Sequence, residues 1–203
     1  MMKKLIALVM ALLLPLCAMA EMDEDGVVVS FDSAEVFFIP YECYCLTQES
    51  SASQFTRLGL SQREVLAWME DANVQALLFD EAFETEIHVS IALASGMSDF
   101  DDLSVYALDM ACESVESMYI TQGYDVETVD MCHTINGHSY VQIVASYLYE
   151  DGYVTHTRGY FTCQSGYVVS VLLYPFEGAP TEEQIYLCEG IIDSLWLTLN
   201  VEE

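Results

Sequence analysis

Residues 137–175, GHSYVQIVASYLYEDGYVTHTRGYFTCQSGYVVSVLLYP, decide the fold of this chain. They contain three β-type segments, which cover residues 140–149, 153–162 and 167–174. The two connections between these segments are short, and each contains a glycine, Gly152 or Gly166. Loops this short join antiparallel neighbours, because a parallel pair needs a long crossover. We therefore predict an antiparallel meander at the centre of a sheet.

Turn signals and apolar periodicity extend the sheet toward the N-terminus. The further strands that we expect cover residues 27–31, 35–39, 42–47, 74–79, 86–93 and 124–132, and a short one covers residues 195–199. Residues 86–93 alternate between apolar and other side chains, which predicts one core face and one face outside the core. The dipeptide Asn136-Gly137 is typical of a tight turn and leads the last of these strands into the meander.

Three amphipathic helices are expected. The first runs from Ser61, an N-cap candidate with Glu64 in a capping box, to about Asn73, after a polar loop over residues 48–54. The second covers about residues 104–122, and the third opens at Thr181. The inner stripe expected for the second helix consists of Val105, Leu108, Cys112, Val115 and Met118 or Tyr119. Asp99, Asp101 and Asp102 are expected to cap that helix.

These elements predict the α+β class, with an antiparallel sheet of roughly six to eight strands and about three helices packed on it. A curved cystatin-like or NTF2-like sheet around one long helix is the alternative.

The N-terminus has the pattern of a secretory signal peptide. Lys3 and Lys4 precede an apolar run, and the small residues Ala18 and Ala20 flank Met19. We predict cleavage after Ala20, an acidic leader over residues 21–26 and a single α+β domain over residues 27–203. A lipid anchor at Cys17 is the alternative route. No later stretch is apolar enough to cross a membrane, so we expect a secreted or extracytoplasmic protein.

The charge balance excludes one class of partner. The chain has a net charge of −28, and beyond Ala20 its only basic side chains are Arg57, Arg63 and Arg158. Affinity for a phosphate backbone depends on clustered Lys and Arg, so nucleic-acid binding is not expected. Anionic lipid surfaces would also repel this chain. The scattered acidic residues are typical of solvated faces that keep an exported protein soluble.

The order of strands and helices resembles the PsbP-like superfamily, which includes the extrinsic photosystem subunit and the DcrB-like bacterial envelope proteins. The residues that carry the resemblance are FFIP at 37–40, LGLS at 58–61 and IIDSL at 191–195. The resemblance implies an accessory or assembly role, and it assigns no catalytic residue and no cofactor to any position of this chain.

Cysteines offer the one set of candidate metal ligands. Cys43, Cys45, Cys132 and His133 have the ligand chemistry of a zinc site, but their spacing matches no standard zinc motif, so no metal is predicted. The sequence leaves open whether the cysteines beyond Ala20 form disulfides or pack as free thiols. Cys112 and Cys188 lie on inner helix stripes, where a free cysteine acts as a small apolar residue.

The sequence contains no recognisable catalytic motif. There is no Gly-x-Ser-x-Gly elbow, and the strand neighbours Cys132 and His133 aim at opposite faces. His88 and His156 are expected to make ordinary surface or cross-strand contacts. We therefore predict a non-catalytic, exported accessory or binding module with a protein or envelope component as partner. The alternative is a hydrolase that acts on envelope or extracellular polymers through paired carboxylates.

Tyrosines of the meander are the candidate binding surface, because tyrosine combines apolar area with a hydroxyl group. The residues concerned are Tyr147, Tyr149, Tyr153 and Tyr160, together with Arg158. Arg158 would serve an anionic ligand, although the abundance of acidic neighbours favours a structural ion pair.

Overall fold

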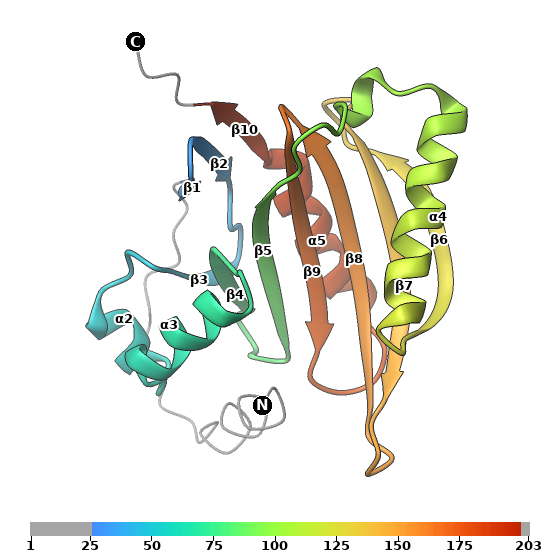
Figure 1. Ribbon diagram of the computed structural model, residues 1–203. Helices are drawn as coiled ribbons and strands as arrows, with labels where there is room; N and C mark the ends of the chain where they lie inside the picture. Colours follow the sequence, from blue (N-terminus) through green and yellow to red (C-terminus); the bar gives the residue numbers. More distant parts are fainter. Residues whose placement is uncertain (1–25, 200–203) are drawn as a thin grey trace.

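A computed structural model describes residues 26–199; the predicted signal peptide, Cys17 and the leader up to residue 25 lie outside the described residues. Its main element is an antiparallel sheet of seven strands in the order β3-β4-β5-β9-β8-β7-β6 (Figure 1). The strands are β3 (Cys43–Thr47), β4 (Ala76–Asp80), β5 (Thr85–Leu93), β6 (Asp125–His133), β7 (Ser139–Leu148), β8 (Val154–Gln164) and β9 (Tyr167–Pro175). The predicted meander is β7-β8-β9. Because β9 is the middle strand of the seven-stranded sheet, the predicted central position of the meander is confirmed.

A second sheet was not predicted. It contains β1 (Val27–Phe31), β2 (Ala34–Phe38) and β10 (Trp196–Leu199), with β2 in the middle. The N-terminal hairpin was expected, but its partner is the last strand of the described chain. The backbone N–H of Ile39 also donates to Ser194 Oγ at 2.9 Å. Ser194 is the last residue of the helix that precedes β10, so this bond connects the small sheet to that helix.

Helices cover both faces of the large sheet. They are α2 (Ala52–Arg57), α3 (Gln62–Asp71), α4 (Val105–Thr121) and α5 (Glu182–Ser194), with a short 3-10 helix η1 (Phe100–Asp102). Helix α5 lies on one face, whereas α3 and α4 lie on the opposite face, called the outer face below (Figure 1). Of these helices, not one has the length and apolar character needed to cross a membrane. The α+β class is confirmed.

The pleat divides the core between the two faces. Under α5 and the small sheet, the buried cluster includes Phe38, Ile87, Tyr160, Val171 and Ile191. On the outer face, one cluster lies under α2 and α3, and two adjoining clusters lie under α4. The outer-face apolar side chains are therefore gathered at the two sides of the sheet.

Several local predictions were wrong. Residues 52–57 form α2 instead of part of a loop, because Gln54 Oε1 accepts the Ser51 N–H at 2.7 Å and Phe55 is fully buried. Ser61 is the N-cap residue of α3, as predicted, but its side chain makes no capping bond, so the predicted capping box with Glu64 is wrong.

The predicted inner stripe of α4 was partly wrong. Leu108, Cys112, Val115 and Tyr119 do pack on the sheet. Val105 and Met118, by contrast, are exposed. The helix begins one residue after Ser104, whose Oγ accepts the Ala107 N–H at 3.3 Å. The three nearby aspartates therefore do not cap it.

Gly159 of β8 generates the first prediction. A Cβ atom there would lie 2.9 Å from Leu172 Cδ2 and 3.0 Å from both Ile143 Cγ2 and Phe161 Cε2. Because these neighbours are packed side chains of three strands, we expect Gly159→Ala to lower the free energy of unfolding by about 1–3 kcal/mol in urea titrations.

Gly190→Ala is the matched control. It lies inside α5, and its added Cβ would meet only the ring of the exposed Tyr41, at 3.1 Å. Helix propensity gains about 1 kcal/mol from this change, so the unfolding free energy should stay equal or rise. Equal losses for both variants would show that Gly159 has no special packing role.

A candidate site in a groove on the outer face

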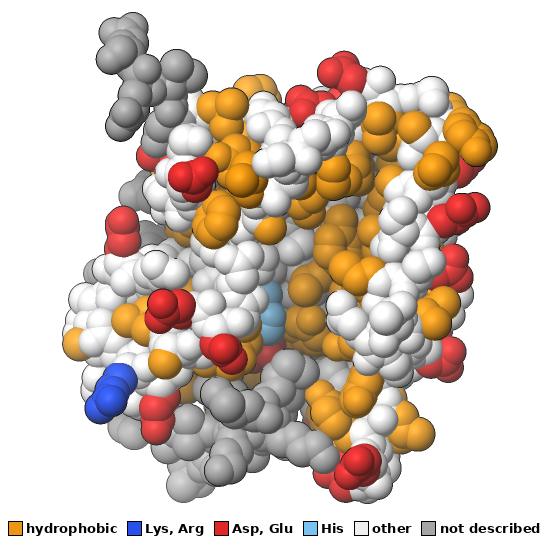
Figure 2. All heavy atoms as spheres, viewed as in Figure 1, with side chains coloured by type: hydrophobic (Ala, Val, Ile, Leu, Met, Phe, Trp, Pro, Cys, Tyr) orange, Lys and Arg blue, Asp and Glu red, His pale blue; other side chains and the backbone are white. Residues whose placement is uncertain are grey.

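The outer helices leave a strip of the large sheet uncovered. This strip, called the central groove below, runs over β5, β9 and β8 between α3 and α4. The cross-strand pairs Glu86–Tyr174 and His88–Leu172 form its floor. Figure 2 shows the hollow, with orange apolar side chains and pale blue histidine between the two flanking masses. The groove is therefore a candidate surface for a partner.

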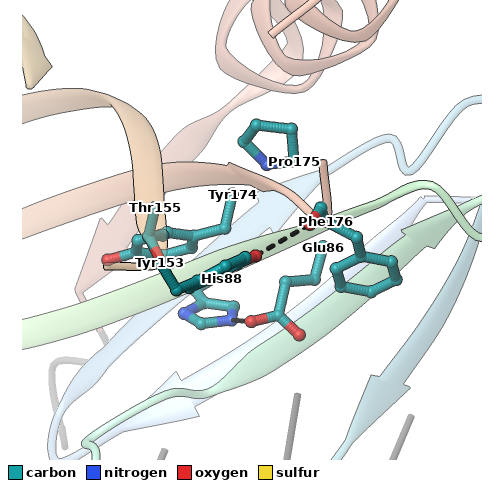
Figure 3. A pocket seen from close by; sticks show the side chains of 7 residues that line it. All are labelled: Glu86, His88, Tyr153, Thr155, Tyr174, Pro175 and Phe176. Atoms are coloured by element: carbon teal, nitrogen blue, oxygen red, sulfur yellow. Dashed lines mark hydrogen bonds and ion pairs between the residues drawn. The ribbon is translucent and has the colours of Figure 1, made fainter. Parts of the chain in front are cut away.

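A histidine and a glutamate lie buried at one end of the groove. His88 is 6% exposed and Glu86 is 5% exposed, and His88 Nε2 lies 3.1 Å from Glu86 Oε1 (Figure 3). The His88 ring packs against Tyr174 with 4.8 Å between ring centroids, and against Trp68 of α3 with 5.0 Å. His88 thus makes the predicted cross-strand contact, with Tyr174 of β9, and together with α3 this contact buries the ring instead of leaving it at the surface.

The pocket around this pair is small and incompletely satisfied. It is a cavity of about 10 Å³ lined by Glu86, His88, Tyr153, Thr155, Tyr174, Pro175 and Phe176. Thr155 Oγ1 is buried with no partner in hydrogen-bond geometry. Burial raises the pKa of Tyr153, and the neighbouring Thr155 side chain opposes this shift. His88 Nε2 contacts the Glu86 carboxylate. The hydroxyl of Tyr153 donates to the Phe176 carbonyl at 2.8 Å. Burial raises the pKa of Tyr174 well above its ordinary value, so this phenol stays neutral.

Three of the four predicted tyrosines lie together beside this pocket. Neighbouring ring centroids are 5.2 Å apart for Tyr124 and Tyr147, 4.8 Å for Tyr147 and Tyr149, and 6.0 Å for Tyr149 and Tyr153. The row continues to Tyr119 of α4, 5.0 Å from Tyr124. An aromatic row thus connects the end of α4 with the pocket.

Tyr160 and Arg158 lie on the α5 face instead. Arg158 Nε donates to the Tyr160 hydroxyl at 2.7 Å, and its Nη2 lies 3.4 Å from Glu189 of α5. The Tyr160 hydroxyl donates to the same glutamate oxygen at 2.9 Å. Arg158 is thus held in the structural ion pair that its acidic surroundings favoured, away from the tyrosine row.

The candidate metal ligands are not brought together. Cys43 and Cys45 belong to β3, whereas Cys132 and His133 belong to β6, at the opposite edge of the seven-stranded sheet. Across residues 26–199, no group of three His, Cys, Asp or Glu side chains is placed to hold a metal ion. No disulfide joins the six described cysteines. Burial, aided by Asp80 and Glu42, raises the pKa of Cys43 to about 12, so its thiol stays protonated.

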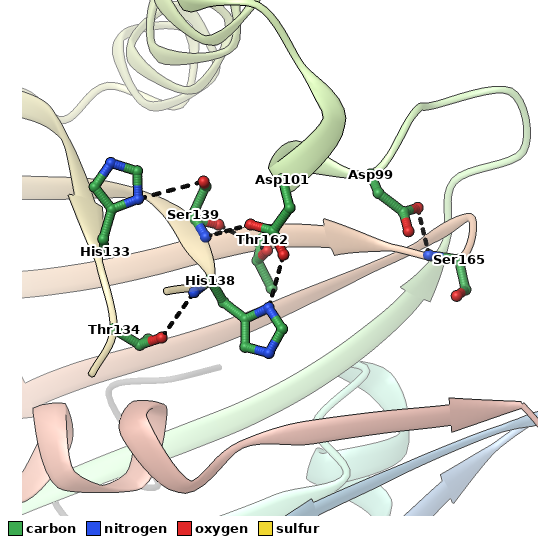
Figure 4. A network of polar contacts seen from close by, with 8 residues as sticks. All are labelled: Asp99, Asp101, His133, Thr134, His138, Ser139, Thr162 and Ser165. Carbon is green, nitrogen blue, oxygen red and sulfur yellow. Dashed lines mark hydrogen bonds and ion pairs between the residues drawn. The ribbon is translucent and has the colours of Figure 1, made fainter. Parts of the chain in front are cut away.

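A polar network at the far end of the sheet has a structural role (Figure 4). Asp101 accepts the Ser139 N–H at 2.6 Å, and its other oxygen lies 2.7 Å from His138 Nδ1. Asp99 accepts the Ser165 N–H at 2.6 Å. Ser139 Oγ lies 3.4 Å from His133 Nδ1, but Ser139 is buried at the start of β7. The aspartates therefore fasten η1 to the ends of three strands instead of capping α4.

A larger, acidic cavity lies elsewhere on the described chain. It measures about 320 Å³ and its lining includes Glu42, Asp80, Glu84 and Glu183. Burial raises the pKa of Asp80, although its Oδ1 accepts the N–H groups of Glu84 and Thr85, each at 2.8 Å. The Asp80 carboxylate thus stabilises the turn between β4 and β5 by accepting these two backbone hydrogen bonds.

The sequence held a signal for the pocket that was not used. Glu86 and His88 are two residues apart on a strand, so they share one face. The alternation of residues 86–93 placed that face outside the core. Only the positions of α3 and β9 show that it is buried.

Comparisons with known proteins concern the fold. No protein-family model matches the sequence, and no curated protein matches it. The structure is similar to cyanobacterial PsbP (CyanoP) from Synechocystis sp. PCC 6803, at 12% identity and a TM-score of 0.49, over 92% of this chain and 99% of that chain. It is also similar to PA94, a protein of unknown function from Pseudomonas aeruginosa, at 11% identity and a TM-score of 0.36, over 79% and 86% of the two chains. Neither likeness bears on function.

The Asp101 network generates a pH prediction. Burial alone would raise the pKa of Asp101, but hydrogen bonds from His138 and Ser139 outweigh it and hold the pKa below its ordinary value of 3.8. The stabilisation is therefore present above that value and is lost as the pH falls through the lower pKa of the folded state. We expect Asp101→Asn to cost at most about 1 kcal/mol at neutral pH, since solvent screens a partly exposed group.

Urea titrations at several pH values check this result. The stability difference between wild type and Asp101→Asn should shrink toward zero as the pH falls well below the ordinary pKa of 3.8. Asp102→Asn, an exposed neighbour in η1, is the control and should show little difference at any pH. A difference that stays constant over this fall in pH would contradict the assigned role of Asp101.

Proposed function

We propose that this chain is an exported, non-catalytic binding module that holds an extended segment of a partner protein in the central groove. The single observation that carries the proposal is a strip of sheet left uncovered between two helices, with aromatic rings and buried polar atoms without partners along it.

Energetics support a binding role for this strip. An unpartnered buried hydroxyl costs about 1–3 kcal/mol, and Thr155, which lines the groove pocket, has no partner in hydrogen-bond geometry. A ligand that hydrogen-bonds to Thr155 would recover part of that cost. Tyrosine and tryptophan rings nearby supply apolar contact area of the kind enriched at protein interfaces.

Charge and targeting support the class of partner. The signal-peptide pattern supports export with cleavage after Ala20. The net charge of −28 favours a partner that carries positive charge and disfavours a second acidic protein. A basic segment of an exported or envelope protein meets both conditions.

The acidic cavity favours a second candidate, a hydrolase of envelope or extracellular polymers. Asp80 has the raised pKa of a general acid, and other carboxylates share its cavity. The test is hydrolysis of cell-wall and glycan substrates by wild type and Asp80→Asn, which keeps Oδ1 as an acceptor for the turn. We expect no hydrolysis by either protein. Hydrolysis by wild type that is lost in a correctly folded Asp80→Asn variant would establish the enzyme.

Partner capture tests the favoured function. Tyr153→Ala removes a ring from the groove, and Tyr186→Ala removes one from α5, where Tyr186 is 76% exposed on the other side of the sheet. In pull-downs from the native exported fraction, we expect Tyr153→Ala to reduce recovery of the main partner by about tenfold, because a lost interface aromatic costs over 1 kcal/mol.

The outcome separates the two surfaces. Tyr186→Ala should recover the partner as wild type does. Equal recovery by Tyr153→Ala and wild type, with both proteins folded by circular dichroism, would move the binding site away from the groove.

A further inference from the structure

We infer that the pocket of Glu86, His88 and Thr155 receives the ammonium group of a lysine side chain from the partner protein. The inference rests on the proposed function, since it names the side chain that would enter the same groove. It depends on the size of the pocket, on its hydrogen-bonding groups and on the absence of lysine from the folded chain.

The size of the pocket selects a small head group. A volume of about 10 Å³ holds roughly one water-sized particle. A primary ammonium group has about that size, whereas a planar guanidinium or a trimethylated ammonium is several times larger. The pocket therefore suits lysine better than arginine or a quaternary amine.

The hydrogen-bonding groups fit an ammonium donor. An ammonium group has three N–H donors and no acceptor. The Glu86 carboxylate supplies a buried negative charge, and Thr155 Oγ1 is an acceptor without a partner. His88 Nε2 lies 3.1 Å from Glu86 Oε1, so the imidazole and a bound ammonium group would share this carboxylate. All three groups line one cavity (Figure 3).

The aromatic walls fit the rest of the lysine side chain. Tyr153, Tyr174 and Phe176 line the cavity beside the carboxylate. Aromatic rings attract a cation placed over their faces, and the methylene stem of lysine packs on apolar surface while its head group binds a polar site. The groove outside the pocket would then hold the partner backbone.

The chain cannot supply this side chain to itself. Its only lysines are Lys3 and Lys4, which lie within the predicted signal peptide. A second copy of the processed protein lacks lysine for the same reason. The occupant must therefore come from a different protein, and the negative field of this chain would raise the rate of its approach.

Three capped amino acids test the inference by NMR titration of the full processed chain. The probes are N-acetyl-lysine N-methylamide, its Nε-trimethylated form and the norleucine analogue, which has no charge. We expect the lysine probe to give saturable shifts at His88 and Thr155. The trimethylated probe should bind at least about tenfold more weakly, because the same charge does not fit the cavity. Equal shifts from both charged probes would reduce the effect to general attraction of cations and overturn the inference.

Two variants separate binding from folding. Glu86→Gln keeps the shape of the side chain, removes its charge and should weaken the lysine probe at least about tenfold. Thr155→Val removes a hydroxyl that the free protein leaves unpartnered, so it should raise the urea midpoint while it weakens the lysine probe. A stabilised Thr155→Val that binds the probe as wild type does would overturn the role of Thr155 in the site.

The failures of the two proposals are distinguishable. If norleucine and lysine probes bind the groove equally, or if no probe binds while partner recovery still depends on Tyr153, the lysine inference is wrong and the groove keeps its binding role. If partner recovery is independent of Tyr153, the proposed function fails, and the inference that rests on it fails too.

Discussion

The structure depends on covering both faces of one seven-stranded sheet. Strand β9 is its middle strand, so alternate side chains such as Val171 and Leu172 need neighbours on opposite sides. Helix α5 and the small sheet cover one face completely enough to bury Val171 and Ile87 fully. On the outer face, α3 and α4 pack at the two sides and do not meet. The central groove is the part of the sheet that this set of helices leaves uncovered.

The elements with local signals were predictable, and those that depend on distant contacts were not. Gly152 and Gly166 mark the turns of the meander, which the structure reproduces, and Thr181 with Gln184 forms the capping box that opens α5. By contrast, β10 pairs with β2, which is far away in the sequence, and no local sequence pattern predicts this pairing. The burial of His88 had the same cause: its strand alternates plainly, but the rings that enclose it come from α3 and β9.

Acidic residues have distinct roles that depend on their position. On β6, an edge strand of the large sheet, Asp125, Glu127 and Asp130 accompany a register shift between Val126 and Thr128. Charges and bulges on an edge strand oppose pairing with other chains. Elsewhere the carboxylates of Asp99 and Asp101 accept backbone N–H groups and fix loops. The acidic residues thus contribute both to edge protection and to local structure, and composition alone does not separate these roles.

The pairing of β10 with β2 has a consequence for how the chain folds. Trp196 lies opposite Phe37, so the small sheet closes only when the two ends of the described chain meet. Contacts between distant segments slow folding, because the entropy of closing a long loop is lost before the contacts form. During synthesis from the N-terminus, β1 and β2 therefore stay without their third strand until β10 has been made. The small sheet is thus the part of the described chain whose pairing topology completes last.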